Sequence, residues 1–359
     1  MILKKLRQME TWERRKVRGL LIFSVVLLGA LTVFAGDTVC ASGRHPEAPS
    51  RNSTPIAESR PVGEALFVFA VIGDSHISAE RSPDNRYIKA VDKSAELLAN
   101  YVGDINAHIP QVSFVVHLGD VSDKGVWSEF AIARGIVDSL DCRLYPVVGN
   151  HDNFESDAKA SWKRFARMDS TSYTFDYLGF HFVVLDCTQN PYTGVDCNSA
   201  LRQWVERDLE ANRNKRTIVF SHYNMWERSW NAQFDTTEHY QEYSGMKDLR
   251  AILENAGNVV AVINGHVHAN RVEEHNGIYY VDVGATLVGR PSVRYFYVFP
   301  DRIEATYAYI SDCDLLEYVS KVGPKCTACF DKTRVADYAD GQVSDKQFTV
   351  LFEPKPQGP

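Results

Sequence analysis

An unbroken run of apolar side chains near the start of the folded region limits the architecture more than any other feature. Residues 66–72, Leu-Phe-Val-Phe-Ala-Val-Ile, carry no polar side chain, a pattern typical of a strand buried on both faces. Further strands are predicted at 114–118 and 144–148, and helices at 87–102 and 130–140. A strand covered on both faces needs packed layers on each side of its sheet. The chain is therefore predicted to form a layered α/β fold.

The second half of the chain is richer in strands. Strands are predicted at 180–186 and 217–221, on either side of a helix that begins near Ser199, and another is predicted at 259–263. The order, βαβαβ first and a β-rich meander last, predicts a mixed sheet or two packed sheets flanked by helices. The strands of the meander are expected at 278–283, 295–299 and 303–309.

The N-terminus is predicted to lie outside this fold. Basic residues precede an apolar run from Leu20 to Ala35, which is shorter than the roughly 20 residues of a typical membrane-spanning helix. The pattern predicts a secretory signal over residues 1–35, or a signal-anchor that stays uncleaved. Either would place the protein in the periplasm or on the extracytoplasmic face of the membrane. Membrane contact is expected only for the uncleaved anchor.

The rest of the chain divides into three predicted parts. Residues 36–61 are rich in Ser, Pro, Arg and Glu, which predicts a flexible linker. Residues 62–310 hold every predicted strand and form the expected folded domain, and 311–359 form a C-terminal extension of unknown role. Export would place the cysteines in an oxidising compartment, where Cys187 and Cys197 are near enough in sequence to close a loop.

The charge of the chain limits its partners. A formal net charge of -7 argues against nucleic acid, because affinity for nucleic acid comes largely from basic residues on phosphates. A small anionic ligand remains possible, because bound metal ions would supply local positive charge.

Five short polar motifs stand where predicted strands end. Ligands bind at that place in open α/β sheets. Four of the five motifs contain a glycine, which lets the backbone turn tightly so that a side chain can point inward. The motifs are Gly73-Asp74-Ser75-His76, Gly119-Asp120-Val121-Ser122-Asp123, Gly149-Asn150-His151-Asp152, Ser221-His222 and Gly265-His266-Val267-His268.

These motifs are rich in side chains that bind transition metals. Asp carboxylates and neutral His are the main protein ligands of Zn, Fe and Mn, and Asn can add a carbonyl oxygen. One metal would leave several of the residues unused, whereas two metals that share a carboxylate would use them all. The motifs therefore predict a pair of divalent or trivalent ions, Fe, Mn or Zn. The seven predicted ligands are Asp74, His76, Asp120, Asn150, His222, His266 and His268.

The order D-x-H, GD-x-x-D, GNHD, H and GH-x-H resembles the calcineurin-like metallophosphoesterase superfamily. The likeness is greatest to bacterial class III cyclic-nucleotide phosphodiesterases and related phosphohydrolases, and it spans residues 66–282. It implies a four-layer α/β/β/α sandwich, in which two packed mixed sheets are flanked by helices. It also implies that a metal-bridging hydroxide hydrolyses a phosphodiester or phosphomonoester, with a small phosphate ester as substrate.

The resemblance also implies roles for individual residues. His151 would face the substrate, as the acid that protonates the leaving oxygen or as a donor to the phosphoryl oxygens. Asp123 would orient His151, and Asp152 would have a structural role. The implied metal ligands are Asp74, His76 and His268 for the first ion, Asn150, His222 and His266 for the second, and Asp120 as the bridge between them.

Some alternatives stay open. A catalytically silent metal- or phosphate-binding envelope protein could share the motifs, although degenerate relatives usually lose a ligand or the catalytic histidine, and this chain lacks none. Asp123 stands where purple acid phosphatases carry a tyrosine ligand. Residues 223–243 are predicted to be either a specificity loop or a packed loop. His117 is expected to be a hydrogen-bonded buried residue, and His181 a core residue.

Overall fold

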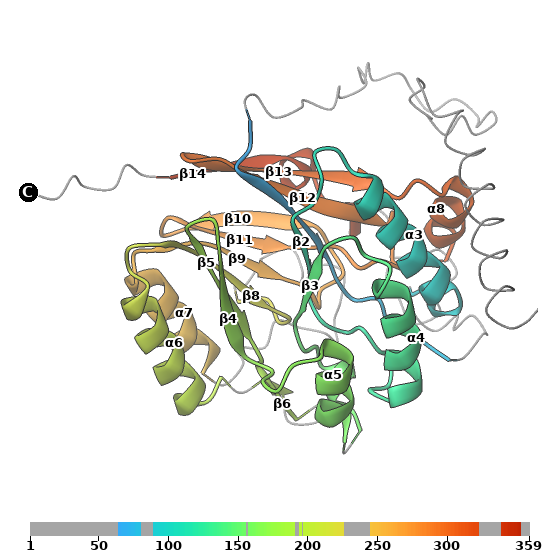
Figure 1. Ribbon diagram of the computed structural model, residues 1–359, viewed down its shortest axis with the longest axis horizontal. Coiled ribbons are helices and arrows are strands. Elements are labelled where there is room, and N and C mark those ends of the chain that lie inside the picture. The colour runs from blue at the N-terminus through green and yellow to red at the C-terminus, as the bar shows by residue number, and fades with distance from the viewer. Residues whose placement is uncertain are drawn as a thin grey trace, which may run out of the picture. The chain divides into compact units, whose positions relative to one another are not determined.

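The computed structural model describes residues 64–79, 89–155, 157–190, 194–195, 197–225, 245–322 and 339–352 (Figure 1). These parts of the chain form two six-stranded sheets and a two-stranded ribbon. The first sheet has the strand order β14-β13-β12-β1-β2-β3. Its strands are β1 (Phe67–Ile72), β2 (Phe114–His117), β3 (Arg143–Pro146), β12 (Ser292–Val298), β13 (Arg302–Tyr309) and β14 (Phe348–Leu351).

The second sheet has the strand order β10-β11-β9-β8-β5-β4. Its strands β5, β8, β9 and β11 run parallel to one another, and β4 and β10 pair antiparallel at the two edges. These strands are β4 (Tyr173–Tyr177), β5 (Phe180–Leu185), β8 (Arg216–Ser221), β9 (Val259–Asn264), β10 (Arg271–His275) and β11 (Ile278–Asp282), and the ribbon is β6 (Thr188–Asn190) with β7 (Gly194–Val195).

Helices cover the outer face of each sheet (Figure 1). The first sheet is covered by α3 (Ser94–Ala107), α4 (Trp127–Val137), α5 (Ala158–Ala166) and α8 (Cys313–Ser320). The second sheet is covered by α6 (Ser199–Ala211) and α7 (Met246–Asn255). The described residues also include the 3-10 helices η2 (Val91–Lys93) and η3 (His151–Asn153) and the short α10 (Val343–Lys346).

Alternation of side chains along the strands divides the apolar core into three layers. In β1, Val68 packs with the helices and Phe69 packs toward the second sheet, because successive strand residues point to opposite faces. In β5, Phe182 faces the first sheet and Val183 faces α6 and α7. The rings of Phe69 and Phe182 meet edge to face at 6.0 Å across the gap between the sheets. Three apolar layers therefore separate four layers of secondary structure.

The predicted fold class is confirmed: two packed mixed sheets are flanked by helices. The third predicted strand contains Pro146 and is β3, which lies at the edge of the first sheet, where a proline is tolerated. The bounds predicted for two helices were wrong. The helix expected at 87–102 is α3, which begins at Ser94 and ends at Ala107, and the helix expected at 130–140 is α4, which begins at Trp127 and ends at Val137.

The segment after residue 310 contributes to the same sheet as β1. Strand β14 pairs antiparallel with β13, which places Val350 opposite Ile303. The next residue after β14, Phe352, lies with its ring 5.8 Å from that of Phe180 in the second sheet. The predicted C-terminal extension thus adds a sixth strand to the first sheet and a contact between the two sheets.

The cysteines differ in state. Cys313 is disulfide-bonded, whereas Cys142, Cys187 and Cys197 are free. The sulfur atoms of Cys187 and Cys197 lie 3.0 Å apart. The two residues are therefore neighbours, as the loop between them was expected to allow, but they are free thiols and not a disulfide.

Several predictions concern residues outside the described ranges. They are the signal segment 1–35, the linker 36–61 and residues 226–243 of the expected loop. Among the described residues, no helix has both the length and the apolar character that a membrane crossing requires.

Candidate metal centre

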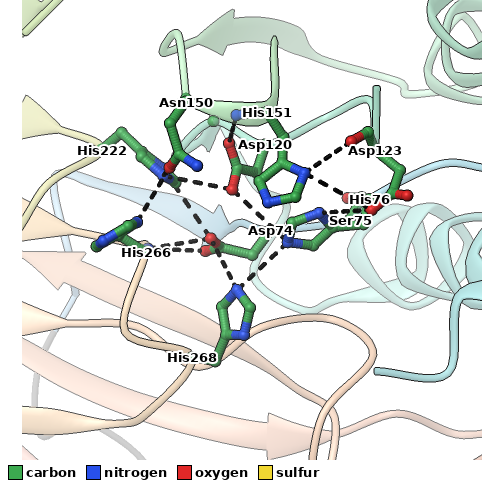
Figure 2. A network of polar contacts seen from close by, with 12 residues as sticks. Asp74, Ser75, His76, Asp120, Asp123, Asn150, His151, His222, His266 and His268 are labelled. Carbon is green, nitrogen blue, oxygen red and sulfur yellow. Dashed lines mark hydrogen bonds and ion pairs between the residues drawn. The ribbon is translucent and has the colours of Figure 1, made fainter. Parts of the chain in front are cut away.

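The five polar motifs meet at one end of the two sheets (Figure 2). Three of them follow β1, β2 and β3, which are parallel neighbours in the first sheet. The other two follow β8 and β9, which are parallel neighbours in the second sheet. Because parallel strands end at the same edge of a sheet, each sheet brings its own motifs together. The seven predicted ligands thus converge, and they fall into two groups that share Asp120.

The first group contains Asp74, His76, Asp120 and His268. One ligand atom from each lies within 4.8 Å of the others. The Nε2 atoms of His76 and His268 are 3.3 Å apart, and His268 Nε2 is 3.4 Å from Asp74 Oδ1. Asp120 Oδ2 lies 3.6 Å from His76 Nε2. Two carboxylates and two imidazoles therefore point at one position able to hold a metal ion.

The second group contains Asn150, His222 and His266. Asn150 Oδ1 lies 2.9 Å from His222 Nε2 and 3.1 Å from His266 Nδ1. Asp120 Oδ2 lies 3.4 Å from His222 Nε2. The same oxygen of Asp120 thus faces both groups, which is the arrangement of a carboxylate shared by two cations.

The protonation of His222 tests whether a cation fits this second group. Its Nδ1 is 2.9 Å from the main-chain carbonyl of Leu118, so Nδ1 carries the hydrogen that it donates. In the neutral ring, the lone pair of Nε2 then faces the carbonyl oxygen of Asn150. Burial lowers the pKa of His222, but the charge of Asp120 and a hydrogen bond to it outweigh burial and raise that pKa to about 9. A proton is thus attracted to the position where a metal ion would sit.

The imidazoles of His266 and His76 are held neutral. Burial and the nearby charge of His222 lower the pKa of His266 to about 3. Burial, followed by the charge of Lys89, lowers the pKa of His76 well below its usual value. Neutral imidazole is the form that binds a metal ion, so both residues are ready to act as ligands without losing a proton.

His151 and Asp123 lie beside the first group. His151 Nδ1 is 2.7 Å from the main-chain carbonyl of Asp123 and 3.7 Å from its carboxylate. The carboxylate is closer to His76, whose Nδ1 it approaches to 3.2 Å. The main chain of Asp123, rather than its side chain, therefore makes the short contact to His151.

The comparisons with known proteins agree with this geometry. Residues 67–270 match the family model described as calcineurin-like phosphoesterase. The chain belongs to this family. It is 25% identical over 209 residues to a probable glycerophosphodiester phosphodiesterase of Arcobacter nitrofigilis, covering 56% of this chain and 72% of that protein. It is 28% identical over 211 residues to purple acid phosphatase 22 of Arabidopsis thaliana, covering 56% of this chain and 44% of the relative.

Solved structures support the fold. A dimetal phosphatase of Danio rerio aligns with a TM-score of 0.57 and 16% identity, covering 69% of this chain and 99% of that one. A purple acid phosphatase from yellow lupin aligns with a TM-score of 0.50 and 16% identity, covering 70% of this chain and 53% of that one. The match to the family model and the two relatives confirm the predicted superfamily, and with it a metal-dependent phosphoric ester hydrolase, and a silent binding protein is not favoured.

The backbone of this phosphoesterase is strained where the ligands sit. Left-handed φ angles are uncommon outside glycine, although Asp and His adopt them more readily than most residues. Each costs on the order of 1–3 kcal/mol and persists only where the surroundings hold it. The predicted ligands with left-handed φ angles are Asp74 (φ 53°), His76 (φ 40°), Asp120 (φ 51°), His266 (φ 68°) and His268 (φ 53°).

Two motif glycines are required by close approach to ligand carboxylates. A Cβ on Gly149 would collide with the carboxylate of Asp120. A Cβ on Gly265 would lie 2.6 Å from Asp74 Oδ2, a distance shorter than van der Waals contact. Glycine at these positions lets the main chain of one motif pack directly on the carboxylate of another.

Buried polar side chains hold the ligand loops. Asp152 is fully buried and accepts hydrogen bonds from the main-chain N–H groups of Ser122 (2.9 Å) and Gly149 (3.0 Å). It therefore joins the loops after β2 and β3. Ser75 Oγ lies 2.6 Å from Nε2 of the buried His117, whose Nδ1 lies 3.3 Å from Gly119 N. His117 is hydrogen-bonded and buried, as predicted, and it joins the loops after β1 and β2.

Three further residues lie beside or act on the site, and sequence patterns missed two of them, Phe154 and Lys89. The ring of Phe154 lies 4.4 Å from that of His151, and the ring of Tyr223 lies 4.6 Å from that of His266. Burial is the largest cause of the lowered pKa of His76, and the positive charge of Lys89 is the second. Burial also lowers the pKa of His151, the charge of Asp120 raises it, and Lys89 lowers it further. Adjacency to a motif makes Tyr223 a candidate for substrate contact and could have indicated Phe154, but nothing in the local pattern distinguishes Lys89.

Proposed function

We propose that this chain hydrolyses a small phosphate ester with two metal ions. The observation that carries the proposal is the position of Asp120, whose Oδ2 faces His76 at 3.6 Å and His222 at 3.4 Å. Mixed nitrogen and oxygen ligands suit Fe, Mn or Zn in divalent or trivalent form. The first ion would be held by Asp74, His76 and His268, the second by Asn150, His222 and His266, and both by Asp120.

The metal ions would supply charge that neutralises the phosphoryl oxygens, and would make a water molecule more acidic. The residues of the chain contribute orientation and a proton. Nδ1 of His151 donates to the carbonyl of Asp123, so Nε2 is the atom available to substrate. In its protonated form, His151 would donate from Nε2 to the leaving oxygen or a phosphoryl oxygen. General acid catalysis of this kind contributes about 10²–10⁴-fold.

The substrate class follows from charge and from similarity. The Arcobacter relative is named as a probable glycerophosphodiester phosphodiesterase, which favours a diester among the small esters. The net charge of -7 disfavours nucleic acid as a partner. A small phosphodiester, with phosphomonoesters as the second class, is therefore the proposed substrate.

The direct test is turnover of chromogenic esters. The full chain, stripped of metal with a chelator and reloaded with Mn²⁺, Fe²⁺ or Zn²⁺, should hydrolyse bis(p-nitrophenyl) phosphate or p-nitrophenyl phosphate. His151→Ala should keep two metal equivalents but lose about 10²–10⁴-fold in rate. The proposal fails if protein with two bound equivalents turns over neither ester with any of the three metals.

We also propose that the protein is exported to the periplasm or the extracytoplasmic face of the membrane. The basic and apolar pattern of residues 1–35 supports this location, and so does the disulfide at Cys313, because disulfides persist in oxidising compartments. The intact mass of protein from the cell envelope would distinguish a cleaved signal from an uncleaved anchor. Membrane contact is expected only if the anchor is uncleaved. Recovery in the cytoplasmic fraction would refute export.

A further inference from the structure

His76 presents its two ring nitrogens to different partners. Nε2 faces the first ligand group, 3.6 Å from Asp120 Oδ2, and is the atom placed to bind a metal ion. With Nε2 bound to metal, the hydrogen of the neutral ring must sit on Nδ1. Nδ1 is buried and makes no hydrogen bond to any described residue. A carboxylate oxygen, Asp123 Oδ1, lies 3.2 Å from it, within ion-pair distance.

Asp123 contacts His151 through a different group. Its main-chain carbonyl lies 2.7 Å from His151 Nδ1. A carbonyl oxygen can only accept, so Nδ1 of His151 carries the hydrogen. The rings of His76 and His151 are perpendicular, with centroids 4.4 Å apart, and Asp123 lies beside both. One residue thus offers its carboxylate to one ring and its carbonyl to the other.

The main chain of Asp123 is held independently of its side chain. Its N–H donates to the carbonyl of Ile77 at 3.1 Å, and Ile77 forms a parallel bridge with Ser122. These contacts join the loops after β1 and β2. Shortening the side chain of Asp123 therefore leaves the carbonyl in place to accept from His151.

The same three side chains, His76, Asp123 and His151, lie close enough to be considered a separate cation site. The hydrogen positions argue against it. Nδ1 of His151 is engaged as a donor, and His76 could bind a second ion only by losing the hydrogen on its remaining nitrogen. If the carboxylate instead accepts a hydrogen bond from a metal-binding histidine, His151 keeps its bond to the carbonyl and His76 keeps its hydrogen. Such carboxylate–histidine pairs orient the ring and make it a stronger ligand.

We propose that the Asp123 carboxylate is a positioning group for the metal ligand His76, and that Asp123 orients His151 through its carbonyl alone. The inference rests on the proposed function, because it assigns Nε2 of His76 to a metal ion. Asp123 then has two separate roles. Its side chain tunes the affinity of the site for the first ion, and its main chain holds His151, the proposed acid.

The test measures metal affinity and turnover separately in the full chain. Metal-stripped protein is titrated with Mn²⁺ by calorimetry, which needs no turnover. Asp123→Ala should weaken one of two sites by about 10–100-fold, the usual effect of losing such a partner. Asp123→Asn keeps an oxygen acceptor of the same shape and should weaken that site less. Asp157→Ala is the matched control, because Asp157 is exposed and makes no side-chain cap to α5.

Turnover against Mn²⁺ concentration then distinguishes the two roles. In Asp123→Ala, added Mn²⁺ should recover most of the lost activity, and the loss at saturation should be smaller than in His151→Ala. The inference is overturned if Asp123→Ala binds Mn²⁺ like the wild type yet loses as much turnover as His151→Ala at saturating metal. It is also overturned if the wild type binds a third equivalent that both Asp123 variants lose. A wild type that binds two equivalents without hydrolysing any ester would refute the proposed function alone, because the titrations would still report on Asp123.

Discussion

The two sheets contribute different chemistry to the metal centre. The loops after β1, β2 and β3 supply both ligand carboxylates and the amide of Asn150, with His76 as their one imidazole ligand. The loops after β8 and β9 supply three imidazoles: His222, His266 and His268. All the negative charge of the predicted ligands thus comes from the first sheet, and the second sheet adds only imidazoles.

The loops of the first sheet are also more extensively tied together. Main-chain hydrogen bonds join Asp74 N to Gly119 O (2.9 Å) and His76 N to Asp120 O (2.8 Å). The two ligand carboxylates in turn hold main-chain groups of other motifs, with Asp74 accepting from His266 N at 3.0 Å and Asp120 from His151 N at 2.8 Å. The first sheet therefore forms the charged frame of the site, and the histidines of the second sheet complete it.

Removing the shared carboxylate should have the largest effect. Asp120→Asn keeps the size of the side chain but removes the charge that faces both groups. We expect the protein to lose both metal equivalents on dialysis and kcat/KM to fall by a factor on the order of 10³ or more, since metal ions stabilise phosphoryl transfer by several kcal/mol. Elemental analysis and diester turnover measure the two effects. Retention of two equivalents would show that the frame does not depend on this charge.

Removing a histidine of the second sheet should have a smaller effect, limited to one of the two metal ions. His222→Ala deletes the imidazole that faces Asn150 but leaves Asp74, His76, Asp120 and His268 intact. One metal equivalent should remain, and turnover should fall by a factor on the order of 10², equivalent to roughly 3 kcal/mol. Metal content per chain checks the prediction. If both metal equivalents were lost, binding of the first ion would depend on the histidines of the second sheet as well as on the carboxylates of the first.

The sequence predicted this division only in part. Apolar runs identified β1, β2, β5, β8 and β9, because these strands are almost entirely buried, and the polar residues at the ends of five strands then indicated a site. Strand β4 was missed because its residues are largely half-buried, which leaves no apolar run. Strand β14 was missed because its partner β13 lies about 40 residues earlier, and a pairing of that kind has no local signature.

The finer details of the site depend on geometry that residue types do not encode. The grouping of ligands around each ion came from a resemblance rather than from spacing. The left-handed φ angles of Asp74 and Asp120 are imposed by the tied loops, and no sequence pattern marks them. Nor does a pattern distinguish the carbonyl of Asp123 from its carboxylate as the partner of His151.

The smallest expected effect concerns the tie between the loops after β1 and β2. Gly119 N donates to His117 Nδ1, so Nε2 of His117 carries the hydrogen that Ser75 Oγ accepts at 2.6 Å. Ser75→Ala would leave this buried N–H without a partner, at a cost of about 1–3 kcal/mol. At about 2–4 °C per kcal/mol for a domain of 150–250 residues, the melting temperature of the metal-loaded protein should fall by several degrees while both metal equivalents remain.

A double-mutant cycle isolates that tie from the rest of the frame. His117→Phe removes the buried donor, so the double variant should be less destabilised than the sum of the two single variants. Thermal melting in saturating Mn²⁺ measures all three proteins. Additive losses of stability would mean that Ser75 and His117 stabilise the fold separately. Loss of metal in Ser75→Ala would mean that this single hydrogen bond keeps the carboxylates of the first sheet in position, and that the other loop contacts do not.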